Sequence, residues 1–299
     1  MPRALSPLRN PAGDWLDSLM NQKTYQVQSR YRSNATRCLE VPPYLQGVFW
    51  KSLVLTDKVS LVSASEYAGY IAEDDFKFQS EIRRDINRTF PNLRFFQEVN
   101  SLGQGQLFNV LKAYSVFNPE VGYCQGMGFI VGLLLSHMNE VDAFNVLVAL
   151  MRPDGEYNMQ GLYKPGLPLL NEYLSQLDRM IATDLPRLAH HFASLGIETS
   201  MFASQWILTL LVYSLEWTEA IQIFNIFLVY KIDVILKFSI FTLQRVEKDI
   251  LGMSFEETLG KINDMRGVRV LAFVEWVHRT EERARVEAEA GRLSGNETD

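Results

Sequence analysis

The spacing of the apolar residues is the feature that most limits the folds open to this chain. Apolar side chains recur at intervals of three and four, most clearly at Leu170, Tyr173, Leu174, Leu177 and Ile181. This is the period of one face of an α-helix, and the alternation typical of half-buried strands is nearly absent. Since 47% of the 299 residues are hydrophobic and 21% are charged, the chain can bury a large core. We predict an all-α fold.

Helix-breaking residues divide this pattern near its middle. The densest group of prolines and glycines lies between residues 153 and 168 and separates two helix-rich halves. We therefore predict one folded unit over residues 34–278, with an N-terminal lobe to about residue 152 and a C-terminal lobe from about residue 165. Residues 1–33 are predicted to form a loosely ordered arm, and residues 279–299 a C-terminal helix that frays into a tail.

Charge and cysteine content exclude several classes of protein. With 29 Lys and Arg against 35 Asp and Glu, the net charge of −6 argues against nucleic-acid binding. Two cysteines, Cys38 and Cys124, and an N-terminus without a signal-peptide core are typical of a reducing compartment, so we predict a cytoplasmic protein. The apolar run 129–135 is far shorter than the roughly 20 residues that cross a bilayer, so direct membrane insertion is not expected.

The sequence contains no motif for a nucleotide, a metal or a serine nucleophile of its own. Neither a phosphate-binding G-x-x-x-x-G-K-[ST] loop nor H-E-x-x-H, C-x-x-C or G-x-S-x-G is present. The adjacent pair His190 and His191 would point about 100° apart on a helix, and no third ligand is near in sequence. We expect neither a metal site nor a resident cofactor.

One short segment places an arginine near the end of a predicted helix. Ile82 and Ile86 fall on one helical face with Asp85 at its edge, and Arg88 lies 60° beyond Asp85. Pro91 disfavours helix for the residue before it, which puts Arg88 in the last turn with Asp85 one turn back. The arrangement predicts either a guanidinium positioned by a carboxylate or an arginine that only interacts with the helix dipole.

A second segment, residues 118–128, predicts a turn that brings Gln125 to the start of a helix. Gly122 and Gly126 flank this glutamine and allow another backbone to approach closely. A carboxamide offers a donor and an acceptor at once, so Gln125 could act on a ligand or could cap the helix. The segment alone leaves both interpretations open.

Taken together, the two segments resemble the signature motifs of the TBC domain, the GTPase-activating domain for Rab-type small GTPases. Ile82, Asp85 and Arg88 match I-x-x-D-x-x-R, and Tyr123 and Gln125 match Y-x-Q, in the order and separation of that family. The similarity runs from about residue 40 to about residue 262 and includes residues 41–50, 142–144 and 199–206.

The resemblance implies a two-lobed helical fold that accelerates GTP hydrolysis on a bound Rab in its GTP state, and so a role in vesicle trafficking. It implies that Arg88 is an arginine finger, that Gln125 orients the attacking water, and that Asp85 and Tyr123 support these two residues. GTP and Mg²⁺ would belong to the partner, so the chain would be a GTPase activator without a cofactor. Membrane association would come through the partner's lipid.

Contacts to the Rab are expected around the two fingers. Four residues beside Arg88 and Gln125 are candidates: Asn87, Phe90, Asn118 and Glu120. Which Rab is bound depends on a surface that one sequence does not map.

The sequence also departs from the family pattern at several positions. Gln46 stands where the family usually has arginine, and 222–225 and 230–231 replace an Arg-Ile-Trp-Asp run and a Glu-Gly pair; the altered residues are Gln46, Gln222, Phe224, Asn225, Tyr230 and Lys231. We expect these to lie in scaffold, where a charged contact is replaced by neutral groups. They leave an alternative open, a Rab-binding scaffold that does not catalyse, although degenerate members would be expected to lose Arg88 or Gln125.

Overall fold

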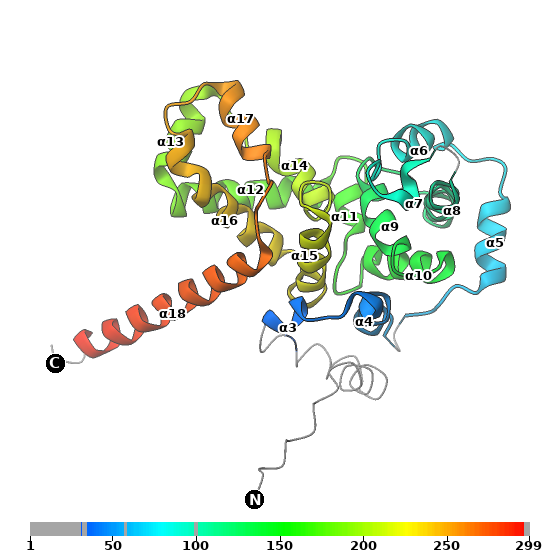
Figure 1. Ribbon diagram of the computed structural model, residues 1–299, viewed down its shortest axis with the longest axis horizontal. Coiled ribbons are helices and arrows are strands. Elements are labelled where there is room, and N and C mark those ends of the chain that lie inside the picture. Colours follow the sequence, from blue (N-terminus) through cyan, green and yellow to red (C-terminus); the bar gives the residue numbers. More distant parts are fainter. Residues whose placement is uncertain (1–30, 32–34, 57–58, 99–100, 296–299) are drawn as a thin grey trace, which may run out of the picture.

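The computed structural model describes residue 31 and residues 35–56, 59–98 and 101–295, with side chains to residue 282. Throughout this part of the chain every regular element is helical, and Figure 1 shows how the helices are arranged. The all-α prediction is confirmed. Apart from Tyr31, the predicted arm 1–33 lies outside the described residues.

The first group of helices surrounds α8. Its members are α3 (Thr36–Leu39), α4 (Gln46–Val54), α5 (Ala64–Ala72), α6 (Gln79–Ile86), α7 (Arg94–Gln97), α8 (Leu102–Phe117), α9 (Met127–Leu135) and α10 (Glu140–Met151), with a short 3₁₀ turn at Pro43–Leu45. Helix α8 packs against α5, α6, α7, α9 and α10. All nine residues of α9 are buried, so α9 belongs to the core of this group.

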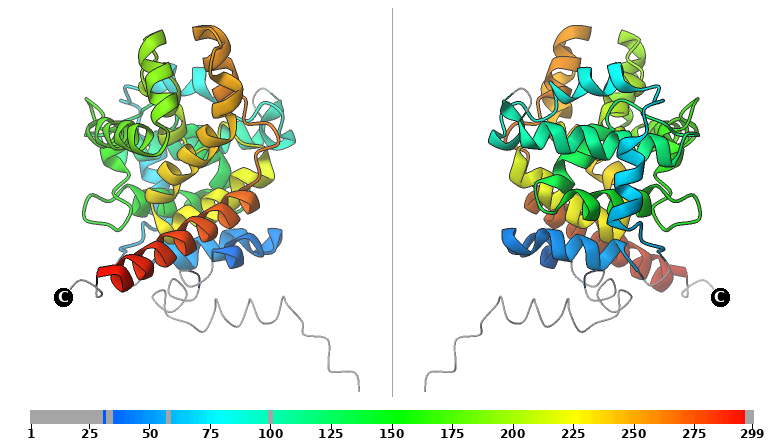
Figure 2. Two further views of the ribbon diagram at one scale, coloured as in Figure 1. Left: turned by 90° about the vertical axis from the view of Figure 1, so that its left-hand side faces the viewer. Right: turned by 90° about the vertical axis from the view of Figure 1, so that its right-hand side faces the viewer.

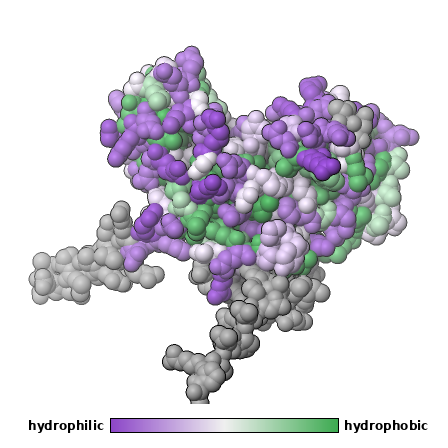
Figure 3. Space-filling view, viewed as in Figure 1, coloured by the Kyte–Doolittle hydropathy of each residue, from purple (hydrophilic) through white to green (hydrophobic). Residues whose placement is uncertain are grey.

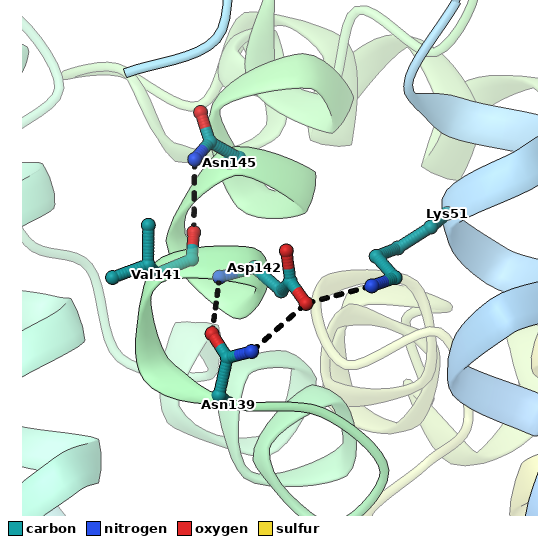
Figure 4. Close-up of polar contacts among 5 residues, drawn as sticks. All are labelled: Lys51, Asn139, Val141, Asp142 and Asn145. Carbon is teal, nitrogen blue, oxygen red and sulfur yellow. Dashed lines mark hydrogen bonds and ion pairs between the residues drawn. The ribbon is translucent and has the colours of Figure 1, made fainter. Parts of the chain in front are cut away.

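Polar contacts fix where α10 begins and how it meets α4. Asn139 is the N-cap of α10, and its side-chain oxygen accepts a bond from the backbone N–H of Asp142 at 2.9 Å. Lys51 of α4 donates to Asp142 at 2.7 Å (Figure 4). Asn145, one turn further along α10, donates to the carbonyl of Val141 at 3.0 Å. The cap thus also ties two helices together.

The second group follows the proline- and glycine-rich stretch. It comprises α11 (Gln160–Tyr163), α12 (Pro168–Asp184), α13 (Pro186–Leu195), α14 (Ser200–Leu208), α15 (Trp217–Tyr230), α16 (Asp233–Ile250), α17 (Phe255–Asn263) and α18 (Val270–Gly295). Helix α12 packs against α13, α14 and α16. Helix α18 runs outward from the body, as Figures 1 and 2 show, and includes most of the predicted C-terminal segment 279–299.

Helix α15 lies between the two groups. It contacts α3 and α4 on one side and α16 and α18 on the other (Figure 1). Nine of its residues are buried, including four phenylalanine and isoleucine side chains at Ile223, Phe224, Ile226 and Phe227. The face in Figure 3 shows hydrophilic and apolar residues over both groups. None of the described helices is both long and apolar enough to cross a membrane.

Several departures from the family pattern meet where α4 and α15 touch. The side-chain oxygen of Asn225 accepts from the indole N–H of Trp50 at 2.6 Å, and its amide donates to the carbonyl of Cys38 at 2.9 Å. Phe224 packs edge-on against Trp50, with ring centroids 5.0 Å apart. Gln46 is buried and donates to the carbonyl of Val41 at 3.0 Å. Neutral hydrogen bonds and aromatic packing therefore hold these helices together.

The end of α15 carries two further departures, Tyr230 and Lys231. The hydroxyl of Tyr230 donates to the carbonyl of Tyr31 at 3.3 Å. Lys231 follows with φ +64° and ψ −155°, a conformation that glycine adopts easily and other residues rarely. Its ammonium lies 2.9 Å from Glu156 and 3.6 Å from the centre of the Tyr157 ring. These contacts accompany the strained backbone at this position.

Candidate functional site

Arg88 lies just after α6, not in its last turn as predicted. The helix ends at Ile86 with Asn87 as its C-cap, and the backbone N–H of Arg88 donates to the carbonyl of Asp85 at 3.1 Å. Phe90 then takes a left-handed conformation, with φ +50°, immediately before Pro91. The turn ends the helix at Ile86, earlier than the proline alone requires. Arg88 is thereby placed on a surface turn, with half of its side chain exposed.

A carboxylate joins the two sequence motifs. Arg88 contacts one oxygen of Asp85 through Nε at 2.9 Å and through Nη2 at 2.6 Å. The hydroxyl of Tyr123 donates a short hydrogen bond to the other oxygen. Burial, followed by the bond to Asp85, raises the pKa of Tyr123 well above its usual value, so this hydroxyl remains a donor at neutral pH. Asp85 is 8% exposed and is held between the two motifs.

Gln125 lies in the loop between α8 and α9, which depends on two left-handed glycines. Gly122 has φ +62°, and a Cβ added there would be 2.4 Å from the ring of Phe78. Gly126 has φ +107° and is the N-cap of α9. Because Gly126 occupies the cap position, the side chain of Gln125 does not cap the helix. Gln125 is instead exposed, in the loop just before α9.

The two candidate Rab contacts on this loop also bind within the molecule. Asn118 donates to the side-chain oxygen of Gln160 at 3.1 Å and to the hydroxyl of Tyr114 at 3.3 Å. Glu120, whose side chain is 67% exposed, pairs with Lys164 at 2.7 Å. Both residues therefore attach the loop between α8 and α9, residues 118–126, to the segment around α11. We call this loop the glutamine loop.

The other two candidates flank Arg88 and differ in exposure. Asn87 is exposed and lines a 350 Å³ hollow between α6 and α8. Phe90 is half-buried, and its ring packs against Phe129 and Trp217 with centroids 5.4 and 5.2 Å away. Phe90 therefore helps to hold the arginine turn against the core.

One exposed aromatic residue near the site was not among the sequence candidates. Tyr213 is 51% exposed on the turn after α14, and its ring packs edge-on against Phe129 at 4.9 Å. Since Phe129 also contacts Phe90, two successive ring contacts connect Tyr213 to the turn that carries Arg88. No local pattern could have indicated this, because the contacts join residues about 40 and 80 positions apart.

The described residues contain no group of three or more histidine, cysteine, aspartate or glutamate side chains arranged to hold a metal ion. Of the histidine pair, His190 is exposed and His191 lies 3.4 Å from the hydroxyl of Thr258. The chemistry available at the site is therefore that of a guanidinium and a carboxamide on neighbouring loops. Both groups face solvent, where a partner could reach them.

Comparisons with known proteins agree with the motifs. The family model described as "Rab-GTPase-TBC domain" matches residues 20–251, so the chain belongs to this family. It is 37% identical over 249 residues to "Rab GTPase-activating protein eat-17" of Caenorhabditis elegans, covering 82% of this chain and 27% of that protein. It is also 37% identical over 219 residues to the human "Ecotropic viral integration site 5 protein homolog", covering 73% of this chain and 26% of that protein.

A solved structure supports the same assignment. The crystal structure of the Chlamydomonas flagellar RabGAP TBC domain superposes with a TM-score of 0.65 and 26% identity, covering 88% of this chain and 92% of that one. The resemblance inferred from the two motifs is thus confirmed. The chain spans about a quarter of the length of the two longer relatives.

Proposed function

We propose that this chain stimulates GTP hydrolysis by a Rab-type small GTPase in its GTP state, by supplying Arg88 and Gln125 in trans. The observation that carries the proposal is the Asp85 carboxylate, which binds Arg88 on one motif and Tyr123 on the other. Only Cys124 separates Tyr123 from Gln125, so this one carboxylate links Arg88 to the segment that carries Gln125. Membership of the Rab-GTPase-TBC family supports the same activity.

Arg88 has the chemistry that phosphoryl transfer requires from a second protein. A guanidinium is planar and always charged, so it neutralises charge that develops on the γ-phosphate and leaving oxygens. Arginine fingers contribute about 10³ to 10⁵ in rate. The partial exposure of Arg88 leaves its free N–H groups able to reach a phosphate, while Asp85 limits its rotation.

Gln125 would orient the water that attacks the γ-phosphate, since a carboxamide accepts from the water and donates to the phosphate at once. GTP and Mg²⁺ would be bound by the partner, and the chain would need no cofactor. The protein would act in vesicle trafficking from the cytoplasm, reaching membranes through the lipid of the Rab.

Single-turnover GTP hydrolysis by a panel of Rab GTPases tests the proposal. We expect at least one Rab to be stimulated by the wild type, with the stimulation reduced about 10³-fold by Arg88→Ala and strongly reduced by Gln125→Ala. Arg84→Ala is the matched control, because Arg84 is an exposed arginine of α6 at a position that the motif leaves variable. It should retain full stimulation.

Two results would contradict the mechanism. Full stimulation by Arg88→Ala would exclude the arginine finger. Binding of GTP-loaded Rab across a wide panel without stimulation would instead support the alternative, a Rab-binding scaffold that does not catalyse.

A further inference from the structure

The short helix α11 lies beside the glutamine loop, although more than 30 residues separate it from Gln125 along the chain. It is only four residues long and falls in the proline- and glycine-rich stretch between the two groups of helices. All four of its residues are nevertheless buried. Because this helix is short and flanked by helix-breaking residues, its burial indicates that contacts with other parts of the chain hold it in place.

One set of contacts runs from α11 through the end of α14 to the residue next to Gln125. The hydroxyl of Tyr163 is buried and donates to the carbonyl of Leu208 at 2.6 Å. Leu208 is the last residue of α14, where helical carbonyls lack partners within the helix. A Cβ added to Gly126 would lie 3.5 Å from Cβ of Leu208, so the end of α14 packs directly behind Gly126.

A second set reaches the other end of the same loop. Gln160 is 5% exposed and accepts from Asn118, the residue that follows α8. Lys164, immediately after α11, pairs with Glu120 at 2.7 Å. The loop therefore touches the α11 segment near its beginning and, through Leu208, near its end.

We propose that α11 with Lys164 is a clamp that sets the position of Gln125, and that Tyr163 and Gln160 are positioning residues for the hydrolysis step. The expected effect of this clamp on the rate of GTP hydrolysis rests on the proposed function. Gln125 itself is exposed, so its placement depends on the loop and not on the packing of its own side chain. A shift of about 1 Å in a group that orients the reacting atoms can cost about 100-fold in rate.

Removal of one hydroxyl tests the clamp without removing the ring. We expect Tyr163→Phe to lower the maximal stimulated rate on a responsive Rab about 10- to 100-fold. The concentration of this chain that gives half-maximal stimulation should change less than about twofold, because the variant leaves the exposed surface intact. In a Gln125→Ala background the same substitution should have little further effect, since the two changes remove one function.

Tyr157→Phe is the matched control. Tyr157 also donates to a carbonyl near a helix end, that of Leu228 in α15 at 2.9 Å, but this bond lies away from the glutamine loop. Its removal should leave the stimulated rate unchanged. If Tyr163→Phe lowered the rate equally with and without Gln125, or no more than Tyr157→Phe does, the positioning role would be wrong.

A second measurement tests the clamp without a GTPase. Cys124 precedes Gln125 and is partly exposed, whereas Cys38 is fully buried and its pKa is raised to about 12 by burial, so iodoacetamide should modify Cys124 first. We expect Tyr163→Phe, but not Tyr157→Phe, to increase the alkylation rate of Cys124 about fivefold. Faster alkylation with no Rab stimulated by the wild type would contradict the proposed function alone. Unchanged alkylation alongside normal wild-type stimulation would contradict the clamp alone.

Discussion

Two regions of the molecule are held together in different ways. We call one the finger network, which consists of Asp85, Arg88 and Tyr123. The other is the helix joint, which consists of Trp50, Phe224 and Asn225. The finger network depends on a charge pair whose arginine is half exposed. The helix joint is fully buried and uses neutral hydrogen bonds and ring packing. The finger network keeps the family motif, whereas two of the joint's residues depart from it.

The proposed function would explain this difference. An exposed guanidinium can meet a phosphate on a partner, so its charge cannot be exchanged for a neutral group. A buried contact between helices has no such requirement, because a buried ion pair is costly to desolvate and a well-bonded neutral group can replace it. We therefore expect substitutions in the joint to reduce stability and substitutions in the finger network to reduce activity.

The largest expected effect is on the joint. Asn225→Leu leaves the indole N–H of Trp50 and the carbonyl of Cys38 without their partner, and each unsatisfied buried group costs about 1 to 3 kcal/mol. We expect urea unfolding to show a loss of about 3 kcal/mol, while the folded fraction keeps its stimulated rate. Asn171→Leu, which removes an exposed bond to the carbonyl of Gly166, should cost less than about 0.5 kcal/mol. Equal losses would mean that the bonds of Asn225 do not stabilise the joint.

The next effect is on the finger network. Asp85→Asn keeps the shape and the acceptor for Tyr123 but removes the charge that holds Arg88. We expect the maximal stimulated rate to fall about tenfold, since a charge-assisted bond contributes about 1.5 to 3 kcal/mol. The unfolding free energy should change by less than about 1 kcal/mol, because Arg88 is half exposed.

Asp154→Asn provides the matching control for that charge. It removes the carboxylate of the exposed pair with Arg152, on the loop before α11. The stimulated rate should not change. If Asp85→Asn lowered the unfolding free energy substantially without lowering the stimulated rate, the expectation that substitutions in the finger network reduce activity would be wrong.

The sequence was sufficient for the all-α class because the three- and four-residue spacing was clear over long stretches such as Leu170 to Ile181. It was also sufficient to bring Asp85, Arg88, Tyr123 and Gln125 into one hypothesis, since two motifs in the right order specify more than either alone. Arg88 was placed in the last turn of α6, although the helix ends at Ile86, because the left-handed turn at Phe90 was not visible in the pattern.

Contacts distant along the chain could not be predicted. Nothing near Asn118 or Glu120 indicated that Gln160 and Lys164 would bind them. Nor did the replacement of a family glycine by Lys231 reveal that the backbone would keep a conformation suited to glycine. Such features depend on tertiary packing, which overrides local preference.

Lys231 offers a smaller test at the end of the joint helix α15. In its conformation a side chain costs about 1 to 3 kcal/mol, whereas glycine loses about 0.5 to 1 kcal/mol of chain entropy on folding. Both Lys231→Gly and Lys231→Ala remove the contacts with Glu156 and Tyr157. The difference between their unfolding free energies therefore reports the backbone conformation at this position. We expect the glycine variant to be more stable in urea by about 1 kcal/mol. A more stable alanine variant would show that the backbone there is not strained.

The smallest effect concerns His137, whose ring packs between Trp50 of the joint and Trp217, with centroids 4.7 and 6.1 Å away. Burial lowers its pKa below the ordinary value of 6.5, so the folded chain binds a proton at this ring less readily than the unfolded chain does. Below pH 6.5 the unfolded chain binds a proton that the folded chain resists, so the unfolding free energy falls as the pH falls toward the folded pKa. Between pH 7.5 and 5.5 we expect the unfolding free energy of His137→Gln, measured in urea, to fall by about 0.5 to 1 kcal/mol less than that of the wild type. Because this proton affects the joint and not the fingers, the folded His137→Gln variant should retain its stimulated rate. If acid lowered the unfolding free energy of the variant as much as that of the wild type, the titrating group would lie outside the joint.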